Sequence, residues 1–264
     1  MIVLAAMILP AVGMLSLIAA TPAAGSQCDR FEPIEGGEVA GVIDARTVRL
    51  RDGRSIRLAG LAPLPEGEGF EQTGRDLLGV LADGKEIMLH ADNAAGLEEP
   101  DRYGRTHALA FVVGAEEPLQ AQLLASGGGL AAADLPKPAC NAELVAAEAR
   151  ARAAARGIWT VPGILKNAQS AGDLLASLGQ FAIVYGTVVS VRQSGATIYL
   201  NFGRRWTHDF AVTMPSKLAP ALGTAKIPVM ALANKRLRVR GWLQRRTGLR
   251  MKVTRADQIE LLAD

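Results

Sequence analysis

Residues 42–63, VIDARTVRLRDGRSIRLAGLAP, decide the fold expected for the first half of the chain. Within residues 47–50 apolar side chains alternate with polar or charged ones, which is the period of a strand with one buried face. An Asp-Gly hairpin turn follows at residues 52–53 and leads into the strand-like run 55–58. Residues 38–43, just upstream, also have strand composition. The segment therefore predicts three successive strands, the last two of which form a hairpin.

Helix-like and strand-like segments alternate beyond this hairpin. We expect strands at residues 85–90 and 106–113, and helices at residues 70–81, 118–125 and 141–156. Five short strands carrying helices are typical of the small oligonucleotide-binding (OB) type of barrel. Residues 37–160 are therefore expected to form a five-stranded OB-type barrel with helices.

Residues 180–264 form a second strand-rich block. The clearest strand candidates there are residues 182–191, 197–202, 209–213 and 236–242. Residues 161–179 are expected to be a linker with some helical content. The expected fold class is mainly β with α (α+β), in which the OB-type barrel is followed by a second small β-barrel-like domain.

Charge is distributed unevenly along the chain. Residues 165–264 carry 15 Lys and Arg against 5 Asp and Glu, whereas residues 1–164 carry 14 against 21. A basic half points to a polyanionic partner such as nucleic acid, anionic lipid or an acidic polymer. A basic surface without a specific partner is the alternative, and the sequence leaves both open.

The N-terminal segment predicts export. Residues 1–24 carry no charge and are mostly apolar, and the small residues that follow suit cleavage by a signal peptidase. No lysine or arginine precedes the apolar run, and the run is long enough to span a bilayer, so an uncleaved anchor competes with a signal peptide over residues 1–25. We expect a periplasmic or secreted protein that touches a membrane only if this leader is retained.

Cys28 and Cys140 are the two cysteines of the chain. An exported protein meets an oxidising compartment, where a lone pair of cysteines tends to be joined. We therefore expect a Cys28–Cys140 disulfide between the start of the mature chain and the end of the first domain. Two unpaired thiols are the alternative.

Four segments between residues 37 and 160 form a series. They are VIDARTVRL at 42–50, IRLAGLAP at 56–63, DRYGR at 101–105, and the helix-like run from EARAR at 148–152 to GIW at 157–159. In this order they resemble the thermonuclease family of staphylococcal-nuclease-like domains. The C-terminal block is similar, more loosely, to an extra barrel-like domain that accompanies such modules in some exported bacterial proteins.

The resemblance implies a site for phosphodiester hydrolysis. The family uses a calcium ion on two Asp side chains, a Glu as the proposed base, and two Arg at the phosphate, where guanidinium groups grip phosphate oxygens in a fork. Arg57 and Arg105 match the two phosphate-binding arginines. Glu66 reaches the position of the base only if one residue is inserted; otherwise Pro65 stands there.

The metal-ligand positions depart from the family pattern. Arg46 and Ala62 stand where the two calcium-binding aspartates are expected, so two carboxylates are lost and a cation is gained. The affinity of a calcium site depends on the charge of its ligands, and a cation about 4 Å from the metal would oppose binding by roughly 1 kcal/mol or more per unit charge. We expect no cofactor and an anion-binding pocket made by Arg46, Arg57 and Arg105.

Basic and aromatic residues gather in the C-terminal block. Arg204, Arg205 and Trp206 are adjacent, and a strand with alternating arginines places three of them on one face. These three are Arg236, Arg238 and Arg240. Such a surface suits single-stranded nucleic acid, which binds by stacking and backbone attraction. Equally, the aromatic residues belong to the core and the arginines to a solvated face.

Three functional hypotheses remain open. The first is an exported thermonuclease-like protein that binds nucleic acid or another anionic polymer, with calcium-dependent hydrolysis impaired or lost. The second is an active metal-dependent endonuclease, in which Asp44 and Glu66 or Glu68 hold calcium. The third is an envelope structural module that recognises no nucleic acid. His90, His107 and His208 lack metal-ligand spacing, so a zinc site is not expected.

Overall fold

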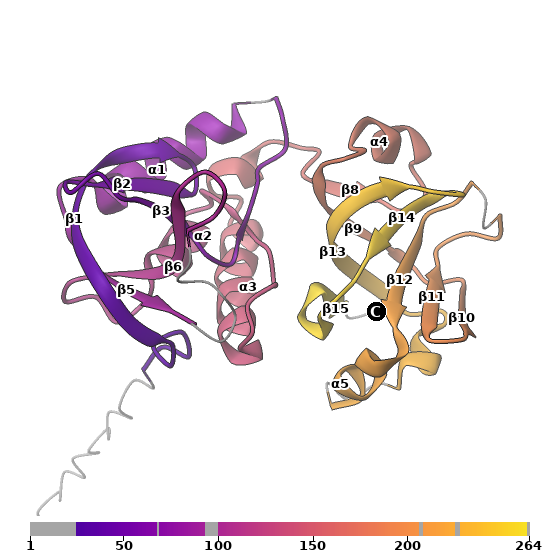
Figure 1. The fold of residues 1–264 in the computed structure, drawn as a ribbon. Coiled ribbons are helices and arrows are strands. Elements are labelled where there is room, and N and C mark those ends of the chain that lie inside the picture. The colour runs from indigo at the N-terminus through magenta and orange to yellow at the C-terminus, as the bar shows by residue number, and fades with distance from the viewer. Residues whose placement is uncertain (1–24, 68, 93–99, 206–207, 225–227, 263–264) are drawn as a thin grey trace, which may run out of the picture.

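A computed structural model describes residues 25–67, 69–92, 100–205, 208–224 and 228–262. Nearly all of the predicted leader, residues 1–24, lies outside the described residues. The described chain is an α+β protein with two strand-rich regions that lie side by side (Figure 1). Among the described residues, no helix has both the length and the apolar character needed to cross a membrane.

The first region is a ring of five hydrogen-bonded strands in the order β1-β2-β3-β6-β5. Their bounds are Glu32–Asp44 (β1), Thr47–Leu50 (β2), Ser55–Leu58 (β3), Glu86–Ala91 (β5) and Arg105–Val112 (β6). The pair β3–β6 is parallel and the other pairs are antiparallel. The five predicted strands are therefore confirmed.

Strand β1 is longer than the expected run of residues 38–43. Its first half pairs with β5, from Glu32 opposite Ala91 to Glu38 opposite Glu86, and a bulge interrupts this ladder after Ile34. A side chain at Gly36, within the bulge, would place its Cβ 1.9 Å from the Ile87 carbonyl oxygen. Strand composition alone misses this half of β1 because the bulge requires glycine, which is a poor strand former.

Three helices accompany the ring, at Phe70–Ala82 (α1), Leu119–Ala125 (α2) and Pro138–Ala153 (α3). All three were expected, although α3 begins three residues earlier, at Pro138, whose missing N–H suits the first turn. It also ends earlier, and Ala155 just beyond it has a left-handed φ of 46°. The short strands Leu61–Ala62 (β4) and Leu130–Ala131 (β7) pair with each other between ring and helices.

The second region is a mixed sheet of eight strands. Seven follow the order β10-β11-β12-β14-β13-β9-β8, and β15 pairs with β13. The bounds are Leu165–Asn167 (β8), Phe181–Thr187 (β9), Ser190–Ser194 (β10), Thr197–Asn201 (β11), Ala211–Pro215 (β12), Arg236–Arg245 (β13), Leu249–Lys252 (β14) and Ile259–Leu261 (β15).

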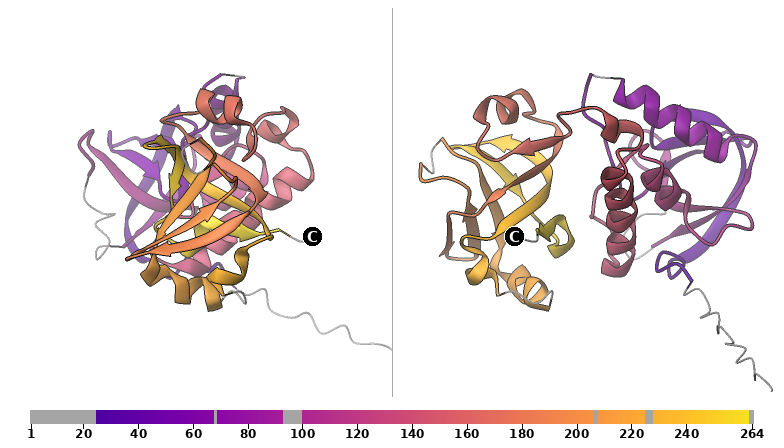
Figure 2. Two further views of the ribbon diagram at one scale, coloured as in Figure 1. Left: turned by 90° about the vertical axis from the view of Figure 1, so that its right-hand side faces the viewer. Right: turned by 180° about the vertical axis from the view of Figure 1, so that it is seen from behind.

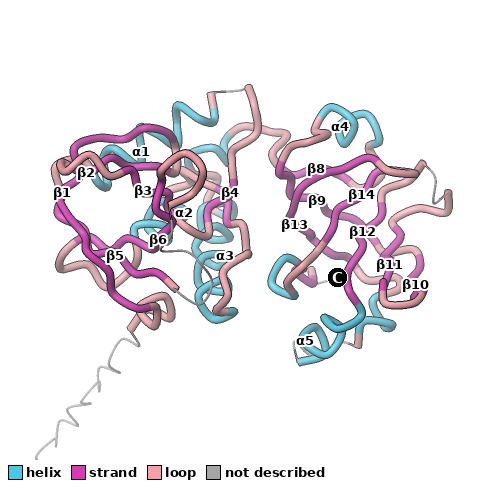
Figure 3. Tube along the Cα trace, in the orientation of Figure 1, coloured by secondary structure: helices cyan, strands magenta, loops and turns pink. Residues whose placement is uncertain are grey.

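The expected linker contributes to this second region. It supplies β8 and the short helix Ala171–Ala176 (α4), and another short helix, Ala219–Thr224 (α5), follows β12. Figure 3 shows how strands dominate both regions while α3 stands on the side of the first region that faces the second. The view from behind gives the same arrangement (Figure 2).

A small apolar cluster joins the two regions. Phe181 and Ile183 of β9 belong to the same buried cluster as Ala62, Leu130 and Ile158 of the first region. Each region also has a larger apolar core of its own. The contact between the regions is therefore partly hydrophobic, the kind of contact that favours a fixed arrangement.

The expected Cys28–Cys140 disulfide is present, with both residues fully buried. It spans 112 residues of sequence and joins the segment before β1 to the first turn of α3. In the chain-entropy model, a crosslink that closes a loop of this length restricts the unfolded chain strongly.

We expect loss of this disulfide to destabilise the first region by about 2–5 kcal/mol. The measurement is urea unfolding of the oxidised protein and of a Cys28→Ser/Cys140→Ser variant. The reduced wild-type protein serves as the matched control, because it lacks the bond but keeps both sulfur atoms. Equal stability of the oxidised and reduced proteins would contradict this expectation.

Candidate anion-binding pocket

The three arginines singled out from the sequence line one pocket in the first region. Its volume is about 220 Å³, and Arg46, Arg57 and Arg105 are joined there by His107 and Asp134. The remaining lining residues come from β3, from the chain that follows it, and from residues 135–136. The sequence prediction that these guanidinium groups gather at one place thus agrees with the described geometry.

The turn between β1 and β2 positions Arg46. The Asp44 carboxylate accepts a hydrogen bond of 2.9 Å from the Arg46 backbone N–H, and Glu71 of α1 accepts one of 2.8 Å from Ala45. Helix α1 can approach this turn because residue 74 is glycine; a Cβ there would lie 2.7 Å from the Cβ of Ala45. Close helix packing therefore holds the turn that presents Arg46.

Arg57 is the most buried cation of the pocket. Its side chain projects from β3, opposite Thr47 and beside His107 in the strand register, and the residue is 8% exposed. The Nη1 atom is buried without a hydrogen-bond partner, and the closest carboxylate oxygen, from Asp44, lies 3.6 Å away. Burial is the main cause that lowers the pKa of Arg57. A buried guanidinium with a free donor is costly to the fold unless a ligand accepts from it.

Arg105 is held by the turn that precedes it. The Asp101 carboxylate accepts hydrogen bonds from Nε and Nη2 of Arg105, at 2.9 and 2.7 Å, and from the Tyr103 backbone N–H. These bonds, led by that from the Arg105 side chain, hold the pKa of Asp101 well below its usual range. Gly104 has a φ of 73°, which an L side chain rarely adopts, so the turn depends on glycine. Asp101 thus fixes Arg105 in place, as expected for a residue that shapes the turn.

The pocket gathers three cations, with Asp134 in its lining and Asp44 and Asp101 beside Arg57 and Arg105. Burial, together with the neighbouring Arg57 and Arg105 charges, lowers the pKa of Arg46 to about 10, which still leaves it charged at neutral pH. Three cations held around a small volume repel one another, and an anion between them relieves that repulsion. The arrangement can therefore bind a phosphate or another compact anion.

The sequence prediction missed two residues of the pocket, His107 and Asp134. His107 is two residues beyond Arg105 on β6, so the strand period alone places both on one face, and this signal could have identified it. Asp134 follows Ala133, which has a left-handed φ of 54°. No sequence pattern predicts a left-handed alanine, so the position of Asp134 in the pocket could not be predicted from the sequence.

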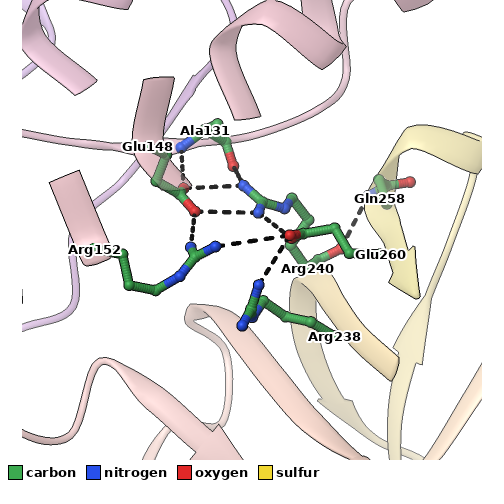
Figure 4. Close-up of polar contacts among 7 residues, drawn as sticks. All are labelled: Ala131, Glu148, Arg152, Arg238, Arg240, Gln258 and Glu260. Atoms are coloured by element: carbon green, nitrogen blue, oxygen red, sulfur yellow. Dashed lines mark hydrogen bonds and ion pairs between the residues drawn. The ribbon is translucent and has the colours of Figure 1, made fainter. Parts of the chain in front are cut away.

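A side chain of the second region holds Ala131, three residues before Asp134 of the pocket. Arg240 of β13 is fully buried and donates to the Ala131 carbonyl at 2.8 Å and to both oxygens of Glu148 at 3.0 and 3.2 Å (Figure 4). Glu148 of α3, also fully buried, accepts a hydrogen bond of 2.8 Å from the Ala131 N–H. Both backbone groups of Ala131 are therefore held by this buried ion pair, three residues before Asp134.

Further charges surround this ion pair. Arg152 donates to Glu148 at 2.7 Å, as expected from their spacing on one helix face, and Glu260 of β15 accepts from both Arg238 and Arg240. Figure 4 shows these side chains converging from α3 and from the second sheet. Each buried charge thus has a partner of opposite sign, which buried ion pairs require.

A second contact reaches the same segment through Asn141. Its buried side chain donates to the Leu135 carbonyl at 2.9 Å and accepts from the Leu135 N–H at 3.0 Å. The same amide nitrogen donates to Asp257 of the second region at 2.8 Å. Ala131 and Leu135, which lie on either side of Asp134, are therefore both tied to the second region.

The other predicted site residues lie elsewhere. Glu66 is exposed and does not line the pocket; Arg204, Arg205 and Arg236 are also exposed, and Trp206 lies outside the described residues. Arg238 and Arg240 share a face of β13 as the alternation predicted. Arg240 is fully buried against Glu148 of the first region, and Arg238 is paired with Glu260 and is only 15% exposed, so both guanidinium groups are engaged within the protein.

The residues of the pocket do not fit calcium. Asp44 faces the Arg57 guanidinium, and Ala62, at an expected ligand position, is a buried methyl group. In the described part of the chain, no three His, Cys, Asp or Glu side chains are grouped as metal ligands. Calcium requires several oxygen ligands, and the donors present here are mostly engaged with arginine.

Comparison with protein-family models and with curated proteins finds no match to this chain. Function is therefore inferred from the pocket and from the resemblance of the four sequence segments.

We expect Arg240→Met to destabilise the protein by about 3 kcal/mol, because it leaves Glu148 and Glu260 short of a partner in a buried place. The measurement is urea unfolding followed by tryptophan fluorescence. The matched control is Arg236→Met, four residues earlier on the same strand but exposed, for which a change below about 0.5 kcal/mol is expected. An Arg240→Met protein as stable as the control would show that the pair does not hold the regions together.

Proposed function

We propose that this protein binds a phosphate-bearing polyanion, nucleic acid in the first instance, and that calcium-dependent hydrolysis of it is impaired or lost. The observation that carries this proposal is the buried Arg57 guanidinium, whose Nη1 atom has no hydrogen-bond partner in a pocket lined by two further arginines. A phosphate oxygen would supply the missing acceptor and add negative charge to that of Asp44.

The roles of the three arginines differ. Arg57 is the buried anchor, Arg46 adds charge from the turn between β1 and β2, and Arg105, held in place by Asp101, keeps three further N–H groups for a ligand. Tyr103 is 65% exposed, with the guanidinium carbon of Arg105 4.9 Å from its ring centre. An exposed ring beside a phosphate site gives a base a surface on which to stack.

The family resemblance supports the same assignment. We propose that the ring of strands is an OB-type barrel of the thermonuclease kind and that the second sheet corresponds to the barrel-like domain expected after it. We further propose that the protein is exported, which the buried disulfide supports. The positions of Arg46 and Ala62 argue against a retained calcium site, and no catalytic base is assigned, because Glu66 does not line the pocket.

We expect Arg57→Met to weaken binding of a short fluorescein-labelled oligonucleotide by about 1.5–3 kcal/mol, the usual value of a hydrogen bond to a charged group. The measurement is fluorescence anisotropy at several salt concentrations. The same variant should unfold at an equal or higher urea concentration than the wild type, because it removes a buried donor without a partner.

Arg49→Gln is the matched control, since Arg49 is an exposed arginine of the adjacent strand β2 and does not line the pocket. It should bind within about twofold of the wild type, because a lone exposed charge contributes little. Loss of stability in Arg57→Met together with unchanged binding would show that Arg57 is only structural, and the proposal would fail.

We expect no calcium-stimulated cleavage of DNA or RNA by the purified protein, because the pocket offers cations where a metal needs carboxylates. The measurement compares cleavage with calcium, with EDTA, and with Arg105→Ala. Vigorous cleavage that requires calcium and disappears in Arg105→Ala would establish the active endonuclease instead.

A further inference from the structure

The second sheet carries a basic groove that shares no residue with the pocket of the first region. Its volume is about 950 Å³, and its main side chains are Arg192, Tyr199, Asn201, Arg204, Met230 and Arg250. A cleft of this size lies at the upper end of the range for small-molecule sites. It therefore suits an extended segment of a ligand better than a single phosphate.

The strand register places the groove on one face of the sheet. Arg192 of β10 lies opposite Tyr199 of β11, Asn201 lies opposite Ala211 of β12, and Ala211 lies opposite Arg250 of β14. Residues opposite one another across strands share a face. Ile198, Leu200, Val212 and Met251 alternate with them and are fully buried on the other face. One face thus serves the core and the other forms the groove.

The lining of the groove is cationic. Arg192, Arg204 and Arg250 line it, and the lining includes no Asp or Glu among the described residues. Asp209 lies at its edge, packed against Gly203, and accepts a hydrogen bond from the Arg205 N–H. Lys252 is exposed on the same face, since its partner in the register, Thr213, is also the partner of Tyr199. Cations outnumber carboxylates here, and such a surface attracts an anionic ligand.

Arg250 and Tyr199 lie next to each other in the lining of the groove. The guanidinium carbon of Arg250 lies 5.7 Å from the centre of the Tyr199 ring, and Arg250 donates from Nη2 to Thr247 at 2.8 Å. The Nε atom of Arg250 is buried without a hydrogen-bond partner. Guanidinium and phenol planes are the surfaces on which nucleic-acid bases stack.

The groove also offers apolar and neutral polar groups. Met230 is 55% exposed and Val189 is 40% exposed, and the Asn201 amide donates to the hydroxyl of Ser190 at 3.1 Å. A purely anionic polymer would leave the apolar side chains of the groove without a contact. An uncharged peptide would leave its three arginines without a counter-charge. A single strand of nucleic acid presents anionic phosphates and flat bases together.

We propose that this groove, on the β10-β11-β12-β14 face, is a second binding site that takes a segment of single-stranded nucleic acid. Arginines 192, 204 and 250 contact the phosphates, and a base stacks against the Tyr199–Arg250 pair. The inference rests on the proposed function, because the groove would bind the same class of ligand as the pocket of the first region. The two sites share no residue, so substitutions can abolish binding at one site and leave the other intact.

The test uses labelled (dT)12 and an abasic strand of the same length, with the Arg57→Met protein as the parent so that the first pocket is silenced. Tyr199→Leu should weaken binding of (dT)12 by roughly 5- to 100-fold, the usual effect of losing one stacked base. Tyr199→Phe should bind within about twofold of the parent, because it keeps the ring. Binding of the abasic strand should be weak in all three proteins and insensitive to Tyr199→Leu.

The arginines are tested by the salt dependence of binding. Arg192→Gln/Arg250→Gln should lower the slope of log affinity against log salt by about 1.4, which corresponds to two phosphate contacts with a single strand. The matched control, Arg49→Gln/Lys85→Gln, removes two exposed charges from the first region and should leave the slope unchanged. Thermal unfolding of each variant checks that the fold is retained.

Several outcomes would overturn the proposal. Unchanged (dT)12 affinity in both groove variants would show that the groove is not a binding site, whether or not Arg57→Met weakens binding in the otherwise wild-type protein. Equal affinity of the parent for (dT)12 and for the abasic strand would show that no base stacks in the groove. Binding to vesicles rich in phosphatidylserine that depends on Arg192 and Arg250, without binding to (dT)12, would assign the groove to a membrane surface.

Discussion

The buried ion pair between Arg240 and Glu148 is the interaction on which the arrangement of this protein depends. Both residues are fully buried, they come from different regions of the chain, and together they hold both backbone groups of Ala131. Removing charge from water is costly, so such a pair persists only where opposite charges and hydrogen bonds offset that cost. Here Arg152, Arg238 and Glu260 surround the pair with further charges, while Nε of Arg240 is buried without a hydrogen-bond partner. The second region is therefore part of the environment of the first pocket and not a separate appendage.

The pocket differs from an ordinary protein interior in the way its charges are arranged. A core normally buries charge in well-separated pairs, whereas here Arg46, Arg57 and Arg105 are gathered in one place, with Asp44, Asp101 and Asp134 as near counter-charges. The three arginines are held together by elements whose positions are set by packing and hydrogen bonding elsewhere in the fold. The ring of strands fixes Arg57, the glycine-dependent turn fixes Arg105, and α1 fixes Arg46 through Glu71. A rigid frame can hold like charges together, and a ligand can then use the energy of their repulsion.

The sequence predicted the local features of this protein better than its long-range ones. The alternation in residues 47–50 and the Asp-Gly turn gave the central hairpin, and the arginines that follow from the family resemblance do meet in one pocket. The alternation of Arg236, Arg238 and Arg240 also placed them correctly on one face of a strand. What periodicity cannot tell is whether a face meets water or another part of the chain. Arg240 is buried because α3, about 90 residues earlier, supplies Glu148, and no local pattern records that contact. Asp134 was missed for a similar reason, since a left-handed alanine is imposed by its surroundings.

The Cys28–Cys140 bond encloses all five strands of the ring within one covalent loop. A single peptide bond cut anywhere between these cysteines, in any connection between two strands of the ring, leaves both fragments attached to each other. The fragments also remain held by the hydrogen-bonded ladders of a closed ring, in which each strand has two neighbours. A nicked chain would therefore keep its shape and separate only under conditions that both reduce and unfold it. Under the proposed export, this topology would give the protein a resistance to proteolytic cleavage that thermodynamic stability alone does not measure.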